Sequence, residues 1–331
     1  MSNKSFRHVI KAGGSALEAA TRPSFSQQRC FSISAAKQAG HVITFSPTSS
    51  PELDSVLDTI RHKILLPTYI RPEQRKKIFR PRYAKELKSN PITMEIDGEV
   101  IKFYGMDPTK GDIPNTRKIL FEAIDKMVTR EDWSNLPHLL EGLYYNANRK
   151  LLPEDYPKMT RKAGVKGQTY TIIECARQVK KTGFRLDTSE KVQELLSWVQ
   201  LMAIDAEMDP EVTKKALTWS ELVLEMLEDK QHQPKRKDEV FLKRFPLNRD
   251  PQILSVPLFL SASLAASQPG DEEIIEKVTK YAKDIVNLWP ADKGLMELHP
   301  AESYEDKCGV QYLVLKNKLL TDIGEGTGVK E

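Results

Sequence analysis

Apolar positions in the middle of the chain recur about every 3.6 residues, the spacing that places side chains on one face of a helix. From Asn115 onward this pattern predicts three helical hairpins, which begin near Thr116, Pro153 and Ser189, with the first joint at Thr129–Ser134. The predicted apolar faces are Ile119, Leu120, Ala123, Ile124, Met127 and Val128, then Leu136, Leu139, Leu140, Leu143 and Tyr144; Tyr170, Ile173, Ala176 and Val179; and Val192, Leu195, Leu196, Val199, Met202 and Ala203, then Val212, Ala216, Trp219, Val223 and Leu227. The hairpins are offset by about 36 residues, which is typical of helical repeats that stack to bury a continuous core.

Elsewhere the chain offers more helices and one hairpin of strands. The second helical hairpin is expected at Pro153–Ala163 and Gln168–Thr182, and further helices at Glu52–Lys63, Pro251–Ala266, Glu272–Leu288 and Lys307–Leu320. Residues 92–96 and 99–104 alternate in polarity around Asp97-Gly98, and Asp-Gly between such runs is a strong signal of a β-hairpin. The predicted fold class is therefore mainly α, with stacked helical hairpins (α-solenoid-like) preceded by a basic arm and one β-hairpin.

The expected organisation has five parts. They are a mitochondrial transit peptide with its flanking disordered segment (1–40), a linker, basic arm and β-hairpin (41–114), a helical-repeat-like domain (115–229), a charged linker (230–250) and a C-terminal helical region (251–331). The first part has one acidic residue, Glu18, and is rich in Ser and Ala. Its basic residues are Lys4, Arg7, Lys11, Arg22, Arg29 and Lys37.

This composition favours import into the mitochondrial matrix. The stretch Arg29–Ser34 also resembles fungal-type matrix-processing sites, with cleavage near Phe31 or Ser32. A merely disordered basic tail is the alternative. A secretory signal is disfavoured because the segment lacks a continuous apolar stretch.

Positive charge is concentrated between residues 61 and 88. The basic residues there are Arg61, Lys63, Arg71, Arg75, Lys76, Lys77, Arg80, Arg82, Lys85 and Lys88, against Glu73 and Glu86. Tyr69, Phe79 and Tyr83 lie among them, and Pro67, Pro72 and Pro81 are expected to hold the segment partly extended.

Guanidinium groups that pair with phosphates, and aromatic rings that stack on bases, suit contact with folded RNA. The candidate RNA-binding residues are Arg71, Arg75, Lys76, Lys77, Arg80, Arg82, Tyr83 and Lys85. A solvated basic linker, or a contact to an acidic protein, is the alternative.

Other chemistry is weakly represented. The cysteines and histidines are scattered without zinc-type spacing, and the acidic pairs Glu131-Asp132, Glu154-Asp155 and Asp271–Glu273 fall at predicted helix starts, where carboxylates bind free backbone N–H groups. Gly164–Gly167 is interpreted as a turn at a helix end. No apolar run is long enough to span a membrane, and no catalytic set is evident. We therefore expect no enzyme activity, cofactor, metal or small-molecule substrate.

Two resemblances add to this picture. The stretch Glu174–Asp187 resembles the second helix and the ending of a pentatricopeptide unit, and the central region resembles degenerate pentatricopeptide or tetratricopeptide repeats, although Leu186 stands where that family usually has proline. Base-reading positions cannot be assigned in such degenerate units, so no one-base-per-repeat code is inferred.

The segment Leu66–Arg75, the β-hairpin and Glu131–Leu143 resemble a fungal family of mitochondrial ribosomal proteins. That resemblance implies a structural subunit in the mitochondrial matrix, with ribosomal RNA and ribosomal proteins as partners. The basic arm would then contact rRNA, and the helical body would contact protein neighbours. A mitochondrial RNA-processing or translation-activating factor, and an assembly factor for a respiratory complex, are the alternatives.

Overall fold

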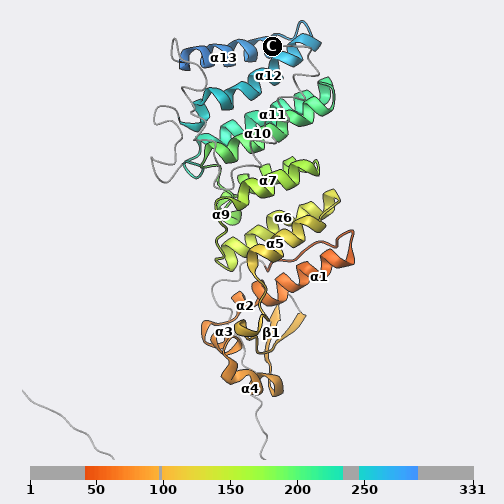
Figure 1. The fold of residues 1–331 in the computed structure, drawn as a ribbon, viewed down its shortest axis with the longest axis vertical. Helices are drawn as coiled ribbons and strands as arrows, with labels where there is room; N and C mark the ends of the chain where they lie inside the picture. Colours follow the sequence, from red (N-terminus) through yellow and green to blue (C-terminus); the bar gives the residue numbers. More distant parts are fainter. Residues whose placement is uncertain (1–41, 97–98, 234–245, 290–331) are drawn as a thin grey trace, which may run out of the picture. The chain divides into compact units, whose positions relative to one another are not determined.

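The computed structural model describes residues 42–96, 99–233 and 246–289. Contacts divide the chain into the units Met1–His41 and Val42–Glu331, and every described residue lies in the second. The predicted transit peptide, the predicted Asp97-Gly98 turn and the helix predicted at Lys307–Leu320 lie outside the described residues. Within them the fold is mainly helical with one hairpin of strands, which confirms the predicted fold class (Figure 1).

The elements follow one another in a simple order. They are α1 (Pro51–Ile60), the π-helical turn η1 (Arg61–Leu65), α2 (Leu66–Tyr69), α3 (Pro72–Ile78), the 3-10 turn η2 (Pro81–Tyr83), α4 (Ala84–Ser89), β1 (Ile92–Ile96), β2 (Glu99–Phe103), the 3-10 turn η3 (Pro108–Lys110), α5 (Thr116–Lys126), α6 (Arg130–Glu141), the π-helical turn η4 (Gly142–Asn146), α7 (Asp155–Val165), α8 (Thr169–Arg177), α9 (Val179–Thr182), α10 (Ser189–Asp205), α11 (Pro210–Glu228), the 3-10 turn η6 (Leu247–Arg249), α12 (Pro251–Ser267) and α13 (Glu272–Leu288). The strands pair antiparallel with Ile92 opposite Phe103 and Ile96 opposite Glu99, which confirms the predicted hairpin.

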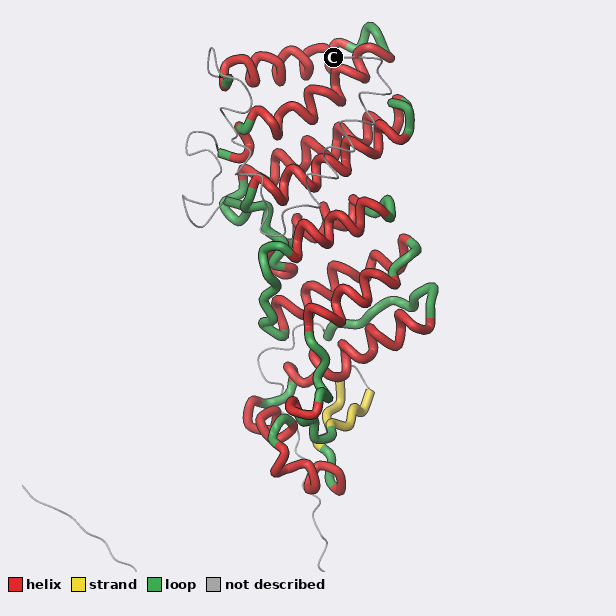
Figure 2. Tube along the Cα trace, in the orientation of Figure 1, coloured by secondary structure: helices red, strands yellow, loops and turns green. Residues whose placement is uncertain are grey.

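The larger helices stack in two layers. One layer runs α1, α5, α7, α10 and α12, each helix in contact with the next, and the other runs α6, α8 and α11. Contacts of α7 with α8, α10 with α11, and α11 with α12 join the layers, and α13 packs on α12 (Figure 2). Contact between equivalent helices of successive hairpins is the arrangement of an α-solenoid. We call α1 and α5–α13 together the helical body.

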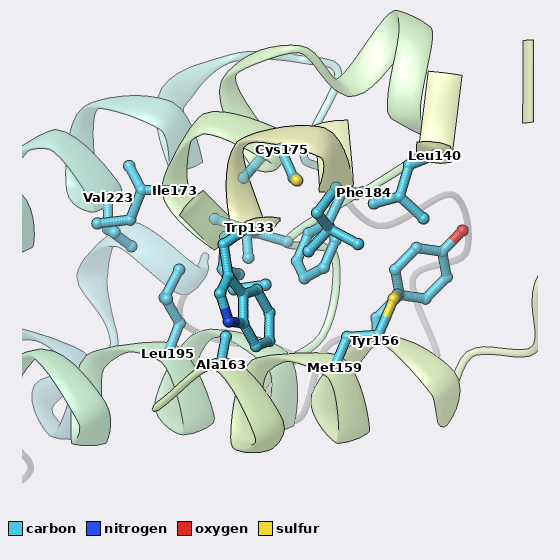
Figure 3. Packing of buried hydrophobic residues seen from close by; sticks show 14 of the residues in the cluster. Trp133, Leu140, Tyr156, Met159, Ala163, Ile173, Cys175, Phe184, Leu195 and Val223 are labelled. Carbon is cyan, nitrogen blue, oxygen red and sulfur yellow. The ribbon is translucent and has the colours of Figure 1, made fainter. Parts of the chain in front are cut away.

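One continuous core lies between the two layers. Trp133 is fully buried on α6, and the Tyr156 ring meets the Phe184 ring edge-on with centroids 5.1 Å apart (Figure 3). The surrounding buried side chains come from α6, α7, α8, α10 and α11 and include Leu140, Met159, Ala163, Ile173, Cys175, Leu195 and Val223. At about 25 cal/mol per Å² of apolar surface, this burial is the main force that holds the stack together.

The first predicted joint is wrong at its C-terminal end. It was expected at Thr129–Ser134, but α6 already begins at Arg130. The Thr129 hydroxyl accepts from the Asp132 N–H, and the Asp132 carboxylate accepts from the Thr129 N–H, which is a capping box. Val128, predicted on the apolar face, lies in the short link before this cap and is 60% exposed.

Tyr170 also departs from its predicted place in the core. It lies in the first turn of α8 and is 38% exposed. Its ring contacts the half-buried Trp219 ring of α11 at 5.2 Å between centroids. It therefore marks the rim of the interface between α8 and α11, whereas Ile173 and Ala176 are buried as predicted.

The two glycines of the Gly164–Gly167 segment are required for different structural reasons. Gly167 follows the end of α7 with φ +68°, so the predicted turn at a helix end is confirmed there. Gly164 lies inside α7, where a Cβ would come within 2.1 Å of the Trp198 ring. A side chain at residue 164 would therefore separate α7 from α10.

Residues 42–50 form an extended segment, the strap, that binds the buried polar side chains of α6. The Ser46 N–H donates to Asn135 Oδ1 at 2.8 Å, and the Asn135 amide donates to the Ser46 carbonyl at 3.1 Å. The Ser49 N–H and hydroxyl donate to the two carboxylate oxygens of Asp132, each at 2.8 Å. Ile43 is buried in the core of the helical body. The strap thus satisfies two polar side chains that have no exposure of their own.

Candidate nucleic-acid interface

The basic arm is folded into short helices, so its expected partly extended conformation is wrong. Residues 72–78, 81–83 and 84–89 form α3, η2 and α4. Pro72 and Pro81 occupy the first position of α3 and of η2, where the missing N–H costs nothing and the fixed φ suits the helix. The prolines therefore start helices here and do not prevent them.

A small apolar cluster holds these helices on the β-hairpin. Its buried members are Leu66, Ile70, Ile78, Leu87 and Phe103, with Val42, Phe79, Tyr83, Ile92, Met94, Ile101 and Met106 partly buried against them. The Met106 N–H donates to the Ile78 carbonyl at 2.8 Å, which ties the segment after β2 to the end of α3. We call residues 66–106 the arm module. Its core gives the charged residues fixed positions.

Eight basic residues against two acidic ones lie between residues 71 and 90 of the arm module. Arg75 is half-buried, whereas Arg71, Lys76, Lys77, Arg80, Arg82, Lys85 and Lys88 are exposed. Lys77 lies 3.9 Å from Glu86, a loose pair between exposed side chains. Within the described part of the chain, no carboxylate comes within 4.0 Å of the charged groups of Arg71, Arg75, Lys76, Arg80 or Lys85. The surface therefore carries positive charge that its own acids do not neutralise.

The candidate RNA-binding residues lie in or next to α3, η2 and α4. Arg71 is the N-cap residue of α3, and Arg75, Lys76 and Lys77 form its last turn, where the helix dipole favours cations. Arg80 precedes η2, Arg82 and Tyr83 lie in it, and Lys85 is in α4. Lys88, one turn after Lys85, is exposed on the same helix. It was counted in the charge cluster but omitted from the candidate residues, although its spacing from Lys85 could have added it.

The aromatic side chains of the arm have structural contacts. The Tyr83 hydroxyl accepts from Arg82 at 2.9 Å, and the Arg82 guanidinium and Lys77 ammonium lie 4.6 Å and 5.5 Å from the centre of its ring. Phe79 packs on the small core, and the Tyr69 hydroxyl accepts from the Ile43 N–H and the Asn146 amide. Tyr83 thus contacts two cations, and base stacking by these rings stays a prediction.

Two side chains with catalytic potential, Cys175 and His232, are buried in structural roles. Burial raises the pKa of the Cys175 thiol far above its ordinary range, so the thiol stays protonated. Burial lowers the pKa of His232, whose Nδ1 accepts from the Leu186 N–H at 3.1 Å. In the residues that the structure describes, no cluster of His, Cys, Asp and Glu is placed to hold a metal ion. None of the described helices combines the length and apolar character that a bilayer crossing requires.

The acidic pairs lie at helix starts, as predicted. Besides its contacts with Thr129 and the strap, Asp132 accepts from the Val128 N–H at 3.0 Å. Burial on its own would raise the pKa of this carboxyl, but the hydrogen bonds from Ser49, Thr129 and Val128 outweigh burial and hold the pKa well below its usual range. Asp132 is therefore a charged structural group that joins the strap to the start of α6.

Comparison with known proteins gives two concordant matches. The family model described as "Mitochondrial ribosomal protein mS27" matches residues 29–323. The "Small ribosomal subunit protein mS27" of Neurospora crassa is 38% identical over 327 residues, covering 95% of this chain and 82% of the relative. Both matches include the strap, the arm module and the helical body. The chain therefore belongs to the mitochondrial ribosomal protein mS27 family.

Proposed function

We propose that this protein is a structural subunit of the small subunit of the mitochondrial ribosome, in the matrix, and that its arm module contacts ribosomal RNA. Membership of the family supports a structural role in mitochondrial translation, and we propose that this role is non-enzymatic. The name of the Neurospora crassa relative supports assignment to the small subunit. The observation that carries the RNA contact is the set of unneutralised cations on the arm module.

Electrostatics favours RNA as the partner of this surface. Each cation that replaces a condensed counterion on a phosphate releases that counterion, so clustered cations gain affinity without a base sequence to read. Because α3 and α4 are anchored by Ile78 and Leu87, the basic residues between them lose little backbone entropy on binding. The arm therefore acts as a preorganised phosphate-binding surface.

The helical body is the proposed contact for neighbouring ribosomal proteins. Its described surface carries large exposed apolar side chains, among them Tyr145, Val165, Phe259 and Val286. They come from η4, α7, α12 and α13, so they are spread along the stack. Such positions suit several small protein contacts, whereas the arm module supplies the concentrated positive charge.

The test compares two variants with equal changes of charge. In the arm variant Arg71, Arg75, Lys76, Arg80 and Lys85 are replaced by Gln. In the control variant the five replacements are at exposed lysines of the helical body, Lys166, Lys180, Lys214, Lys230 and Lys283, which have no described ion pair. Sedimentation of mitochondrial lysate and binding of purified protein to small-subunit rRNA are measured for both.

We expect the wild-type protein and the control variant to co-sediment stoichiometrically with the small subunit. For the arm variant, the slope of log rRNA affinity against log salt should be shallower by about 4.5, since each of the five lost phosphate contacts removes roughly 0.9. Equal rRNA binding by the two variants would contradict the arm contact. Substoichiometric wild-type protein, crosslinked to one messenger RNA, would contradict the ribosomal assignment and favour a translation factor.

A further inference from the structure

A second basic surface lies on the helical body, at the start of α5. Two adjoining hollows of about 670 Å³ and 880 Å³ share Asn115 and Arg117 in their linings. The first is completed by the loop before α7, including Arg149 and Lys150, and the second by Lys118 of α5 and Lys158 of α7. We call these adjoining hollows the α5 groove. Its residues are separate from those of the arm module.

The α5 groove has more cations than its own acids neutralise. Asp125 contacts Lys162, Lys126 pairs with Glu52 at 2.5 Å, and Asp155 pairs with Arg117 at 2.5 Å. Four lining cations, Lys118, Arg149, Lys150 and Lys158, are exposed and have no carboxylate within 4.0 Å among the described residues. Of the acids that line the groove, Glu122 is exposed and has no described ion pair. A positive surplus therefore remains.

Arg117 is fixed at the junction of the two hollows by a buried acid. Its Nε donates to the Asp155 carboxylate, whose side chain is 1% exposed, whereas the Arg117 side chain itself is 45% exposed. The second oxygen of Asp155 accepts from the Leu152 N–H at 3.0 Å. One carboxylate thus positions the guanidinium and the loop before α7 together. The exposed Glu154 carboxylate also lies 3.6 Å from Arg117 Nη2, so the guanidinium is paired with two acids, and Arg117 is not counted among the unneutralised cations of the groove.

The other cations are also held by local structure. Lys158 Nζ lies 4.3 Å from the centre of the Phe121 ring, which is buried on α5. Arg149 and Lys150 follow Asn148, whose φ of +50° is rare for a side-chain-bearing residue, and the Arg149 N–H donates to the Leu143 carbonyl at 2.7 Å. The loop conformation therefore fixes the backbone positions of Arg149 and Lys150.

We infer that the α5 groove binds the sugar-phosphate backbone of a single-stranded RNA segment, as a second contact independent of the arm module. The inference rests on the proposed function only in taking RNA as the partner class. Three of the four unneutralised cations are lysines, and lysine is depleted in protein–protein interfaces, whose centres are apolar and rich in aromatic residues. Leu152 is the large exposed apolar side chain in the lining of the described groove. Contact is expected to be independent of base sequence because these side chains recognise phosphate charge.

The test uses the full chain and a mixed-sequence single-stranded RNA of 20 nucleotides as the probe. The groove variant replaces Lys118, Arg149, Lys150 and Lys158 by Gln, and the matched control replaces Lys166, Lys180, Lys214 and Lys283. Both are combined with the wild-type arm and with the five-residue arm variant. Circular dichroism and thermal unfolding verify that each variant is folded.

We expect the groove variant to reduce the slope of log affinity against log salt by about 3, since each single-strand phosphate contact contributes roughly 0.7, with either arm. The control should leave the slope unchanged. If the arm variant binds the RNA as the wild type does while the groove variant binds it more weakly, the arm proposal is contradicted and the groove proposal stands. A folded groove variant that binds like its control would overturn the inference and leave the hollow to a protein partner.

Discussion

The helical body and the arm module differ in how much of each is buried core and how much is charged surface. In the body, two helical layers bury one continuous core from Leu53 to Ile274, and even polar side chains such as Asp132 and Asn135 are buried and fully bonded. In the arm module, five buried apolar residues support a surface with eight basic residues. The stability of the body therefore depends on a large buried core. The arm module has only a few buried residues, and many of its exposed side chains are charged. Substitutions should affect the two regions very differently.

The largest effect is expected from Trp133→Ala in the body. Removal of this fully buried indole leaves a cavity between the layers and should lower the free energy of unfolding by about 3 to 5 kcal/mol. Trp133 Nε1 has no hydrogen-bond partner among the described residues, so Trp133→Phe loses no such bond and should cost clearly less. Urea unfolding followed by circular dichroism measures both. Equal losses in the two variants would show that the phenyl ring kept in Trp133→Phe does not fill the space left by the indole.

Asp132→Asn tests the bonding of the strap to the body. In either orientation the new NH2 group would face an N–H donor, that of Ser49 or those of Val128 and Thr129. We therefore expect a loss of about 3 kcal/mol, against about 1 kcal/mol for Ser49→Ala. The pKa of Asp132 is lower in the folded protein than in the unfolded chain, so its contribution is complete above the unfolded value of about 3.9 and is lost as pH falls toward the folded pKa.

The difference in stability between wild type and Asp132→Asn should therefore shrink as the pH is lowered below about 4. Unfolding in urea at several pH values measures it. A difference that stays constant down to pH 2 would contradict a folded pKa lower than the unfolded one. A difference that grows would contradict the direction of the pKa shift.

Leu87→Ala should separate the two regions. Leu87 belongs to the small cluster, and its truncation should open the arm module by about 2 to 3 kcal/mol without changing the unfolding of the body. Leu87→Met keeps the volume and should cost less than about 1.5 kcal/mol. Hydrogen exchange of α3 and α4, compared with α6 and α10, measures the effect. Faster exchange in all four helices would mean that the arm and the body unfold as one unit.

Glu86→Gln should have the smallest effect on stability. The 3.9 Å pair with Lys77 joins two exposed side chains, so the loss should be under about 0.5 kcal/mol. Removal of this acid makes the arm more positive, and rRNA affinity at low salt should rise slightly. The matched change Glu131→Gln, at an exposed position on α6, should leave rRNA affinity unchanged. Equal affinity changes would show that the site of the charge is unimportant.

The sequence predicts the elements better than their ends and contacts. The 3.6-residue period gives the helices of the body, and the Asp-Gly turn gives the hairpin, because both depend on local spacing. The start of α6 was misplaced although Thr129 and Asp132 have the spacing of a capping box, a signal that local reasoning contains. Pro72 and Pro81 were expected to hold the arm partly extended, but a proline at the first helical position favours a helix.

Contacts between distant segments are beyond such local signals. The cations of the arm were found because they are consecutive in the chain, although their rigid support on Ile78 and Leu87 was not. Lys118, Arg149 and Lys158 were missed because only tertiary packing brings them to one groove. Nothing in the sequence of residues 42–50 indicates that the strap binds Asp132 and Asn135.

The strap has a consequence for how this chain acquires its structure. Ser49 and Ser46 are separated from their partners on α6 by 83 and 89 residues, respectively. A polypeptide that emerges with its amino end first, from a ribosome or a translocation pore, presents the strap long before Asp132 and Asn135 have appeared. During that interval the arm module can already form from its own neighbouring segments, whereas the body must wait for a long loop to close. During delivery we therefore expect the charged module to be complete before the scaffold that carries it.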